Sequence, residues 1–145
     1  MDIAEYTNSG AELAEREREE LISFLKEIHL DLAKFCKAVF PERFRKEFTK
    51  EHLKICRLFD ERAPFTVANC FRGFGKTSLV NLGVMGRDIL FRDSRFIPYV
   101  SKVATYAESQ TENLRMALVA SPVIRELFGG IRSRKLKEID ESWSK

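Results

Sequence analysis

Hydrophobic residues in the first part of the chain recur every three or four positions, which is the period of one helical face. Between residues 11 and 39, one stripe is formed by Leu21, Leu25, Ile28, Leu32, Phe35 and Val39. We expect a single long helix that docks this stripe on its own domain, with a coiled-coil seam as the alternative. Pro41 ends the pattern, because proline removes a helical hydrogen bond.

The middle of the chain mixes helical and strand-like patterns. A second amphipathic stretch covers roughly residues 49–59, and Ala63-Pro64 interrupts it. Phe65-Thr66-Val67-Ala68 is short, apolar and partly β-branched, which predicts a buried strand. Apolar spacing over 77–92 predicts a helix. Residues 96–101 form a second candidate strand, although Pro98 would remove one ladder hydrogen bond.

Two further helices are expected toward the C-terminus. Residues 105–119 turn Ala107, Leu114, Ala117 and Leu118 inward, and Ser121-Pro122 begins a short helix that Gly129-Gly130 ends. Strands that alternate with helices are typical of a parallel sheet. The sequence therefore predicts the α/β fold class, with a helical N-terminal segment over 1–62 and a sheet flanked by helices over 63–145.

Composition narrows the class of protein. The 145 residues correspond to one domain, and 44% hydrophobic residues with twelve Phe predict a packed core rather than a disordered chain. No apolar run is long enough to span a bilayer. The first 20 residues hold seven acidic and two basic side chains, unlike a signal or transit peptide. We expect a soluble cytoplasmic protein.

Net charge and cysteine content give weaker indications of the binding partners and of a metal site. The first 20 residues have a net charge of −5, which leaves +8 on the remainder, a modest excess that is typical of a solvated surface. Cys36, Cys56 and Cys70 form no CxxC pair, and His29 and His52 are the only histidines. This set does not match the spacing of a zinc site, so we expect buried, reduced thiols.

Residues 70–78, the glycine loop, carry the chemistry of this chain. Gly75-Lys76-Thr77 match the second half of the phosphate-binding pattern GxxxxGK[ST], which lies between a strand and a helix. Gly73 and Gly75 allow successive backbone N–H groups to face one anion. Lys76 would reach the β- and γ-phosphates, and the Thr77 hydroxyl would bind Mg²⁺. The sequence predicts an ATP and Mg²⁺ site formed by Arg72, Gly73, Phe74, Gly75, Lys76, Thr77 and Ser78.

Two residues of the glycine loop depart from the plain pattern. Cys70 stands in place of the first glycine, so the alternative is a turn that merely needs two glycines, with Lys76 on the surface. Arg72 adds a second cation four residues before Lys76. It is either an exposed arginine or a guanidinium that swings onto the γ-phosphate, as an arginine finger supplied by the same chain.

The Arg-Gly-x-Gly-Lys-Thr arrangement resembles the deviant Walker A motif of the large terminase subunit of tailed bacteriophages. The stretch from Phe96-Ile-Pro-Tyr-Val-Ser101 to Phe128-Gly129 is similar to that family's second strand, following helix and closing Phe-Gly pair. Upstream, Phe48-Thr-Lys-Glu-His52-Leu53 resembles the family's segment that covers the adenine base. The resemblance spans roughly residues 30–145, and residues 1–20 have no counterpart.

This resemblance implies the incomplete P-loop NTPase fold of a viral DNA-packaging motor in a phage- or prophage-carrying bacterium. In that family, ATP hydrolysis drives double-stranded DNA into a preformed capsid. The implied partners are the DNA, a portal, a small terminase subunit and further copies in a ring, and a separate nuclease domain cuts the DNA. The acid that binds Mg²⁺ is expected beyond Lys145, because Asp140-Glu141, preceded by Lys137 and Glu138, is typical of a solvated tail.

Two other functions stay open on the sequence. One is a helicase-like or other motor ATPase, and a distal nuclease domain would favour the terminase over it. The other is a nucleotide-independent interaction module whose helix at 21–39 binds a partner. Nucleotide titration with Lys76→Ala as control would separate this module from both ATPases.

Overall fold

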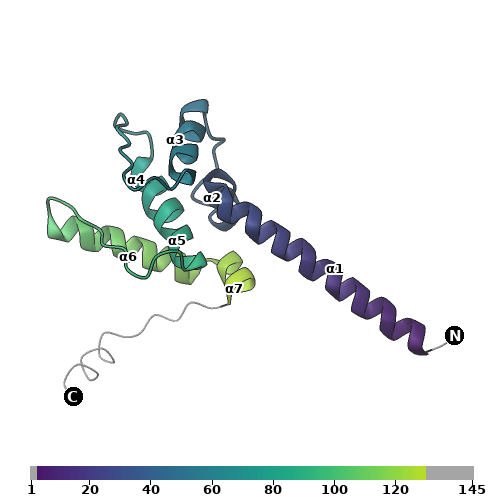
Figure 1. Ribbon diagram of the computed structural model, residues 1–145. Coiled ribbons are helices and arrows are strands. Elements are labelled where there is room, and N and C mark those ends of the chain that lie inside the picture. The colour runs from purple at the N-terminus through teal and green to yellow at the C-terminus, as the bar shows by residue number, and fades with distance from the viewer. Residues whose placement is uncertain (1–2, 130–145) are drawn as a thin grey trace, which may run out of the picture.

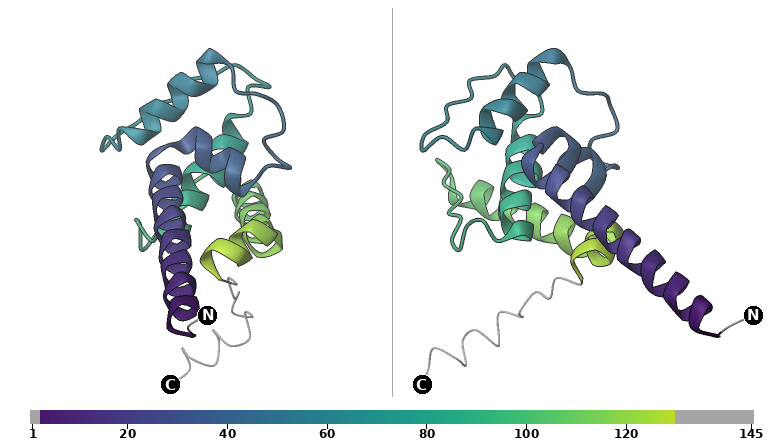
Figure 2. Two further views of the ribbon diagram at one scale, coloured as in Figure 1. Left: turned by 90° about the vertical axis from the view of Figure 1, so that its right-hand side faces the viewer. Right: turned by 45° about the vertical axis from the view of Figure 1, so that its right-hand side comes forward.

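The computed structural model of the protein describes residues 3–129, with side chains from residue 15 onward. Its elements are α1 (Ile3–Leu30), α2 (Leu32–Val39), α3 (Lys50–Asp60), α4 (Lys76–Ser78), the π-helical segment η1 (Leu79–Met85), α5 (Gly86–Phe91), α6 (Ala104–Ala120) and α7 (Pro122–Phe128). Figures 1 and 2 show α1 extending away from a body that the other helices form. No helix in the described range is both long and apolar enough to cross a membrane.

The helix expected over 11–39 is divided in two at Asp31. Asp31 has an extended backbone, and its side chain accepts a hydrogen bond from the N–H of Lys34 at 3.0 Å, which caps the start of α2. Leu21 is 43% exposed, whereas Leu25 packs against the core and the rest of the stripe is buried: Ile28, Leu32, Phe35 and Val39. Docking of the stripe on its own domain is therefore confirmed from Leu25 onward.

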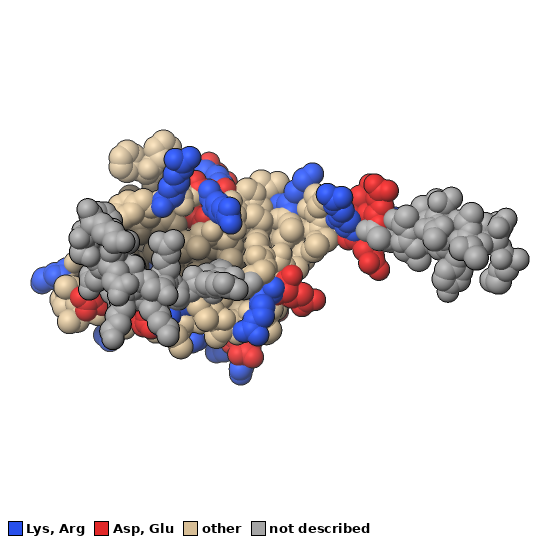
Figure 3. All heavy atoms as spheres, turned by 90° about the horizontal axis from the view of Figure 1, so that it is seen from below, with Lys and Arg blue, Asp and Glu red and all other residues tan. Residues whose placement is uncertain are grey.

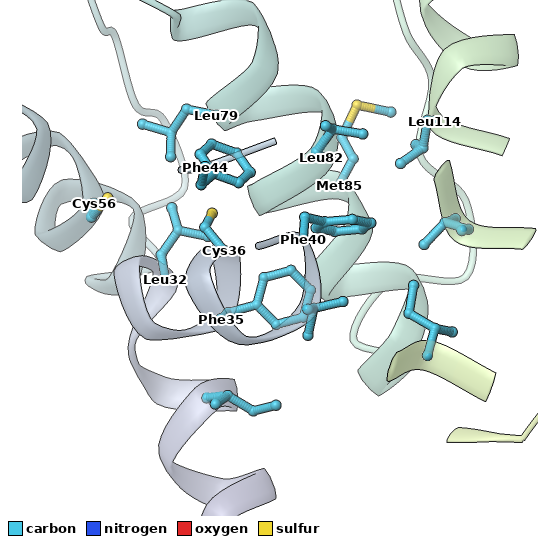
Figure 4. Packing of buried hydrophobic residues seen from close by; sticks show 14 residues of the cluster. Leu32, Phe35, Cys36, Phe40, Phe44, Cys56, Leu79, Leu82, Met85 and Leu114 are labelled. Carbon is cyan, nitrogen blue, oxygen red and sulfur yellow. The ribbon is translucent and has the colours of Figure 1, made fainter. Parts of the chain in front are cut away.

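α4, η1 and α5 form one continuous helical run over residues 76–91, which we call the central helix. It lies against α2, and glycine permits the close approach at Gly83, whereas Gly86 meets Phe40 at an ordinary contact distance. A β-carbon on Gly83 would lie 2.8 Å from the Sγ of Cys36, and one on Gly86 would lie 3.4 Å from the ring of Phe40. Figure 4 shows the side chains of α2 packed between these two helices.

The buried core draws on every helical segment except α4 and α5, and Leu90 and Phe91 of α5 pack against it while partly exposed. Its buried members are Ile28, Leu32, Phe35, Cys36, Val39, Phe40, Phe44, Cys56, Leu79, Leu82, Met85, Leu114, Leu118 and Ile124. Burial raises the pKa of the Cys36 thiol, and raises that of Cys56 to about 12. The prediction of buried thiols is confirmed for these two residues, whereas Cys70 is only half-buried.

A buried ion pair ties three helices together beside the core. The guanidinium of Arg87 in α5 lies 2.5 Å from the carboxylate of Asp60 at the end of α3, and only 2% of the Arg87 side chain is exposed. The same carboxylate accepts the backbone N–H of Leu32, at the start of α2, at 3.2 Å. Asp60 therefore serves both as a counter-ion and as a helix cap.

The C-terminal helices form as the pattern predicted. Leu114 and Leu118 of α6 are buried, and Asn81 of η1 donates to the backbone carbonyl of Gln110 at 2.8 Å. Ser121 accepts the N–H of Ile124 to cap α7, and its hydroxyl donates to the carbonyl of Val39 at 3.2 Å. These bonds fix α6 and α7 against the central helix and α2.

The predicted α/β fold class is wrong. The structure contains only helices between residues 3 and 129, so the parallel sheet of a P-loop NTPase is not formed in that range. Residues 65–68 and 96–101 belong to no helix and pair with no strand there, and their exposure alternates with a period of two. Phe65 and Phe96 are 93% and 82% exposed, whereas Tyr99 packs against the core. The local pattern is thus that of a strand, but a strand also needs a partner.

One polar contact, which we call the Asp93 cluster, lies at the start of both unpaired segments. Arg62 precedes residues 65–68, and Asp93 precedes residues 96–101. The carboxylate of Asp93 accepts hydrogen bonds from Arg62 at 2.9 Å and from the ring Nε2 of His29 at 2.8 Å. His29 also stacks on Phe91, with the ring centroids 4.4 Å apart. The cluster therefore joins the end of α1 to the chain segments that follow α3 and α5.

Candidate functional site

The glycine loop is a turn that leads directly into the central helix. Gly73 and Gly75 have φ values of +90° and +83°, a left-handed conformation that glycine adopts without strain. The central helix begins at Lys76, and the N–H of Leu79 donates to the carbonyl of Gly75 at 3.0 Å. The predicted turn and helix start are confirmed. A β-carbon on either glycine would meet nothing within 4 Å, so backbone conformation, not packing, requires glycine here.

The polar residues of the glycine loop lie at its mouth. Lys76 is exposed, and its Nζ donates to the carbonyl of Cys70 at 3.3 Å, which links the two ends of the loop. Arg72 and Ser78 are exposed, and Thr77 is half-buried. The loop thus carries two cations and two hydroxyl groups at, or within four positions of, the start of the central helix, and of these residues Ser78 lines the adjoining pocket.

Phe74, unlike its exposed neighbours in the loop, is buried, with 7% of its surface exposed. Its ring stacks on His52 of α3, with the centroids 4.1 Å apart and the planes 15° apart. Phe48 continues the row on the far side of His52, and Phe71 meets Phe74 edge to face. This aromatic row, residues 48, 52, 74 and 71, brings the segment before α3 against the glycine loop.

A pocket of about 810 Å³ lies between the glycine loop and the segment before α3. This volume falls within the roughly 300–1,000 Å³ of small-molecule sites. The loop side contributes Phe71, Gly73, Phe74, Gly75, Ser78 and Leu79, and the other side contributes residues 42–49, Glu51 and His52. Flat apolar rings therefore adjoin the two left-handed glycines of the loop.

Charges of both signs surround this pocket. Arg43, Arg45 and Lys46 line it, together with Glu42, Glu47 and Glu51. Backbone and Thr49 hydrogen bonds at the start of α3 hold the pKa of Glu51 below its usual value. Blue and red atoms are also interspersed over the face seen from below in Figure 3, where acidic and basic side chains adjoin on α1.

The residues of the loop fit a nucleotide phosphate. Left-handed glycines allow backbone N–H groups to turn toward an anion, Lys76 is a point charge on a flexible stem, and the start of a helix favours an anion. Thr77 offers one hydroxyl oxygen to a magnesium ion carried by the nucleotide. Among the described residues, no three His, Cys, Asp or Glu side chains come together as metal ligands. Asp140-Glu141, interpreted from the sequence as a tail, lies outside those residues.

One bond that joins α3 to the loop was not predicted from the sequence. The ring Nε2 of His52 lies 2.9 Å from the carbonyl oxygen of Phe74, 22 positions along the chain. The sequence signals only the capping box, because Thr49 and His52 have its spacing, and not the bond to Phe74. Both bonds of that box form, with His52 in the place that Glu or Gln usually takes.

Comparison of the chain with protein-family models, with curated proteins and with solved structures found no match. The chemistry of the site therefore rests on its own residues, which are the glycine loop, the aromatic row and the pocket between them.

Proposed function

We propose that this chain is the ATP-binding portion of the large terminase subunit of a tailed bacteriophage. The glycine loop binds the phosphates of ATP, and the pocket beside it takes the base and ribose. One observation carries the nucleotide assignment: Gly73 and Gly75 are left-handed directly before the helix that begins at Lys76. The resemblance of this loop to the terminase motif carries the assignment to a packaging motor.

The chemistry of the loop supports phosphate binding over a bare turn. An exposed Lys76 is also expected of a bare turn, so the support comes from where its Nζ lies. Lys76 already reaches a backbone carbonyl of the loop at 3.3 Å, which is a position from which it can exchange that oxygen for one on a phosphate. Arg72 places a second exposed cation on the same loop.

The aromatic row supports a flat, partly apolar group beside the phosphates. Phe71, Phe48 and Phe44 line the pocket with ring faces and edges, and adenine is a flat ring that stacks on such groups. The segment that carries Phe48 is the one whose sequence resembles the adenine-side segment of terminases.

In this function, Lys76 binds the β- and γ-phosphates and Thr77 binds the magnesium ion. Arg72 stabilises the charge that develops on the γ-phosphate. Turnover requires a further acid, so we expect the isolated chain to bind ATP weakly and to hydrolyse it negligibly. The proposed partners are double-stranded DNA, a portal, a small terminase subunit and further copies of the chain in a ring.

Alkylation of Cys70 tests the nucleotide site. Cys70 is the one half-buried thiol beside the loop, whereas burial raises the pKa of Cys36 and Cys56 and makes them unreactive. Mg-ATP should slow alkylation of Cys70. The concentration for half of that effect should rise about tenfold or more in Lys76→Ala, because one charge-assisted hydrogen bond is lost. Lys102→Ala, which removes an exposed lysine just before α6, is the matched control.

Two outcomes contradict the proposal. If Mg-ATP leaves the alkylation rate of wild-type Cys70 unchanged, the loop is a structural turn and the chain is better described as an interaction module. If Lys76→Ala and Lys102→Ala respond alike, binding occurs elsewhere. A longer reading frame that encodes no nuclease domain would favour a helicase-like motor over a terminase.

A further inference from the structure

His52 joins the first turn of α3 to the glycine loop through both nitrogens of its ring. Nδ1 lies 3.3 Å from the backbone nitrogen of Thr49 and 2.8 Å from its Oγ1. Nε2 lies 2.9 Å from the carbonyl oxygen of Phe74, on whose ring His52 also stacks. A hydrogen bond and a ring contact therefore hold the same loop residue.

The partners of the two nitrogens assign the proton. A backbone N–H only donates, so Nδ1 accepts from Thr49. A carbonyl only accepts, so Nε2 carries the proton and donates it to Phe74. The two backbone contacts together favour the neutral imidazole with its hydrogen on Nε2, whereas the Thr49 hydroxyl, 2.8 Å from Nδ1, can donate or accept and is compatible with either tautomer.

The bond to Phe74 also sets the direction of the next N–H group. The carbonyl of Phe74 and the N–H of Gly75 belong to one trans peptide, in which these two groups point in opposite directions. Holding the carbonyl toward His52 therefore directs the N–H of Gly75 away from it. Gly75 has no β-carbon to oppose rotation of this peptide, so the peptide turns over easily unless its carbonyl is held.

We infer that His52 is a positioning residue for the glycine loop. Its neutral ring, with the proton on Nε2, keeps the Phe74–Gly75 peptide in the orientation that presents the Gly75 N–H to a phosphate. The role of the phosphate rests on the proposed function, whereas the hold on the peptide needs no ligand. His52 acts only through Phe74 and does not itself touch the phosphate.

Ring nitrogen spectra test the assignment of the proton. The chain contains only two histidines, and His29→Gln identifies the signals of His52 by removing the others. At about pH 7.5 the Nε2 of His52 should give the signal of a protonated nitrogen, and Nδ1 that of an unprotonated one. The reverse pattern, or rapid averaging between the two tautomers, overturns the inference.

Two substitutions separate the hydrogen bond from the stack. His52→Gln keeps a donor near the position of Nε2 but loses the ring, whereas His52→Phe keeps the ring and loses the donor. The Gly75 amide signal should move in His52→Phe and stay close to wild type in His52→Gln. Affinity for Mg-ADP should fall roughly fivefold or more in His52→Phe and stay within about twofold in His52→Gln. Circular dichroism verifies the helical content of both variants.

His29→Phe is the matched control, because His29 also stacks on a phenylalanine and makes a hydrogen bond, at the other end of the central helix. It should leave the Gly75 signal and the affinity unchanged. If the Gly75 signal and the affinity of His52→Phe equal those of wild type, the inference is wrong. Failure of wild type to bind Mg-ADP or pyrophosphate contradicts the proposed function instead, and the Gly75 signal then still decides the role of His52.

Discussion

The Sγ atom of Cys36 lies 2.8 Å from the point that a β-carbon on Gly83 would occupy. Cys36 is completely buried, and the side chain of Leu32 lies 3.3 Å from the same point. The distance between α2 and the central helix is therefore set by a residue that has no side chain. A single methyl group at this position would have to push the two helices apart or displace the thiol.

Gly83→Ala should consequently destabilise the protein by about 1–3 kcal/mol, because an extra methyl group in a packed core strains its neighbours. Gly86→Ala is the matched control, one helical turn further along, where the nearest atom lies at an ordinary contact distance of 3.4 Å. It should be neutral or stabilising, since alanine favours a helix over glycine by roughly 1 kcal/mol. Urea denaturation measures both. Equal stability of the two variants would contradict the prediction and show that α2 or the Cys36 side chain shifts to make room for the methyl group.

Removal of Asp60 should cost much more than removal of a surface charge. Asp60→Ala leaves the guanidinium of Arg87 buried without a counter-ion and removes the acceptor for the N–H of Leu32. We expect a loss of about 3–5 kcal/mol in the free energy of unfolding. The double variant Asp60→Leu with Arg87→Met should recover most of it, because neither charge is then left alone. If the loss in the double variant equals the sum of the losses in the single variants Asp60→Leu and Arg87→Met, the pairing is contradicted.

The Asp93 cluster should make the free energy of unfolding depend on pH in the acidic range. Partial burial acts to raise the pKa of Asp93, but hydrogen bonds from Arg62 and His29 outweigh it and hold this pKa below its usual value. Since the folded-state pKa is depressed, the contribution is complete above the unfolded carboxyl pKa of about 3.9 and is lost as pH falls through the folded value. The melting temperature of wild type should therefore exceed that of Asp93→Asn at about pH 5, and the difference should begin to shrink near pH 4 and vanish only below the depressed folded-state pKa of Asp93.

Glu112→Gln is the control for this measurement. The pKa of Glu112 is also lowered by an arginine, Arg115, but this pair lies on the surface of α6. Surface pairs contribute little to stability, so Glu112→Gln should follow the wild-type curve. A difference between wild type and Asp93→Asn that persists unchanged into strong acid would assign the effect to packing instead of charge.

Arg72 and Lys76 should differ in what their removal changes. Lys76 would contact the phosphates before and during reaction, so Lys76→Ala should weaken Mg-ATP binding and turnover together. Arg72 would act where charge develops, so Arg72→Ala should leave affinity within about threefold. In the longer motor protein that the proposed function implies, it should lower kcat by roughly 10³ or more. A kcat within about tenfold of wild type would make Arg72 a surface residue.

Helices and their caps were predictable because their causes are local. Three- and four-residue spacing located α3, the central helix and α6, and Ser121-Pro122 correctly began α7. The break at Asp31 was missed because the apolar period runs through it without interruption. Only the side chain of Asp31, which caps the second helix, distinguishes two helices from one.

The features that were predicted wrongly or not at all depend on contacts between distant parts of the chain. Residues 65–68 have the composition of a strand, but pairing depends on a second segment that local sequence does not specify. The bond from His52 to Phe74 has the same character, since neither residue predicts the other. The turn at Gly73 and Gly75 and the helix start at Lys76 were predictable, because positive φ and helix initiation follow from residue type.

The exposed, unpaired segments at 65–68 and 96–101 predict that this chain can be cut into fragments that complement one another. A protease binds its substrate as an extended strand, so an enzyme that cuts after exposed aromatic residues can cleave at Phe65 and Phe96 without prior unfolding. The three resulting pieces would contain α1 to α3, the central helix, and α6 with α7. Each holds part of the one core, so the pieces should remain associated after both cuts and reassemble from separate solutions.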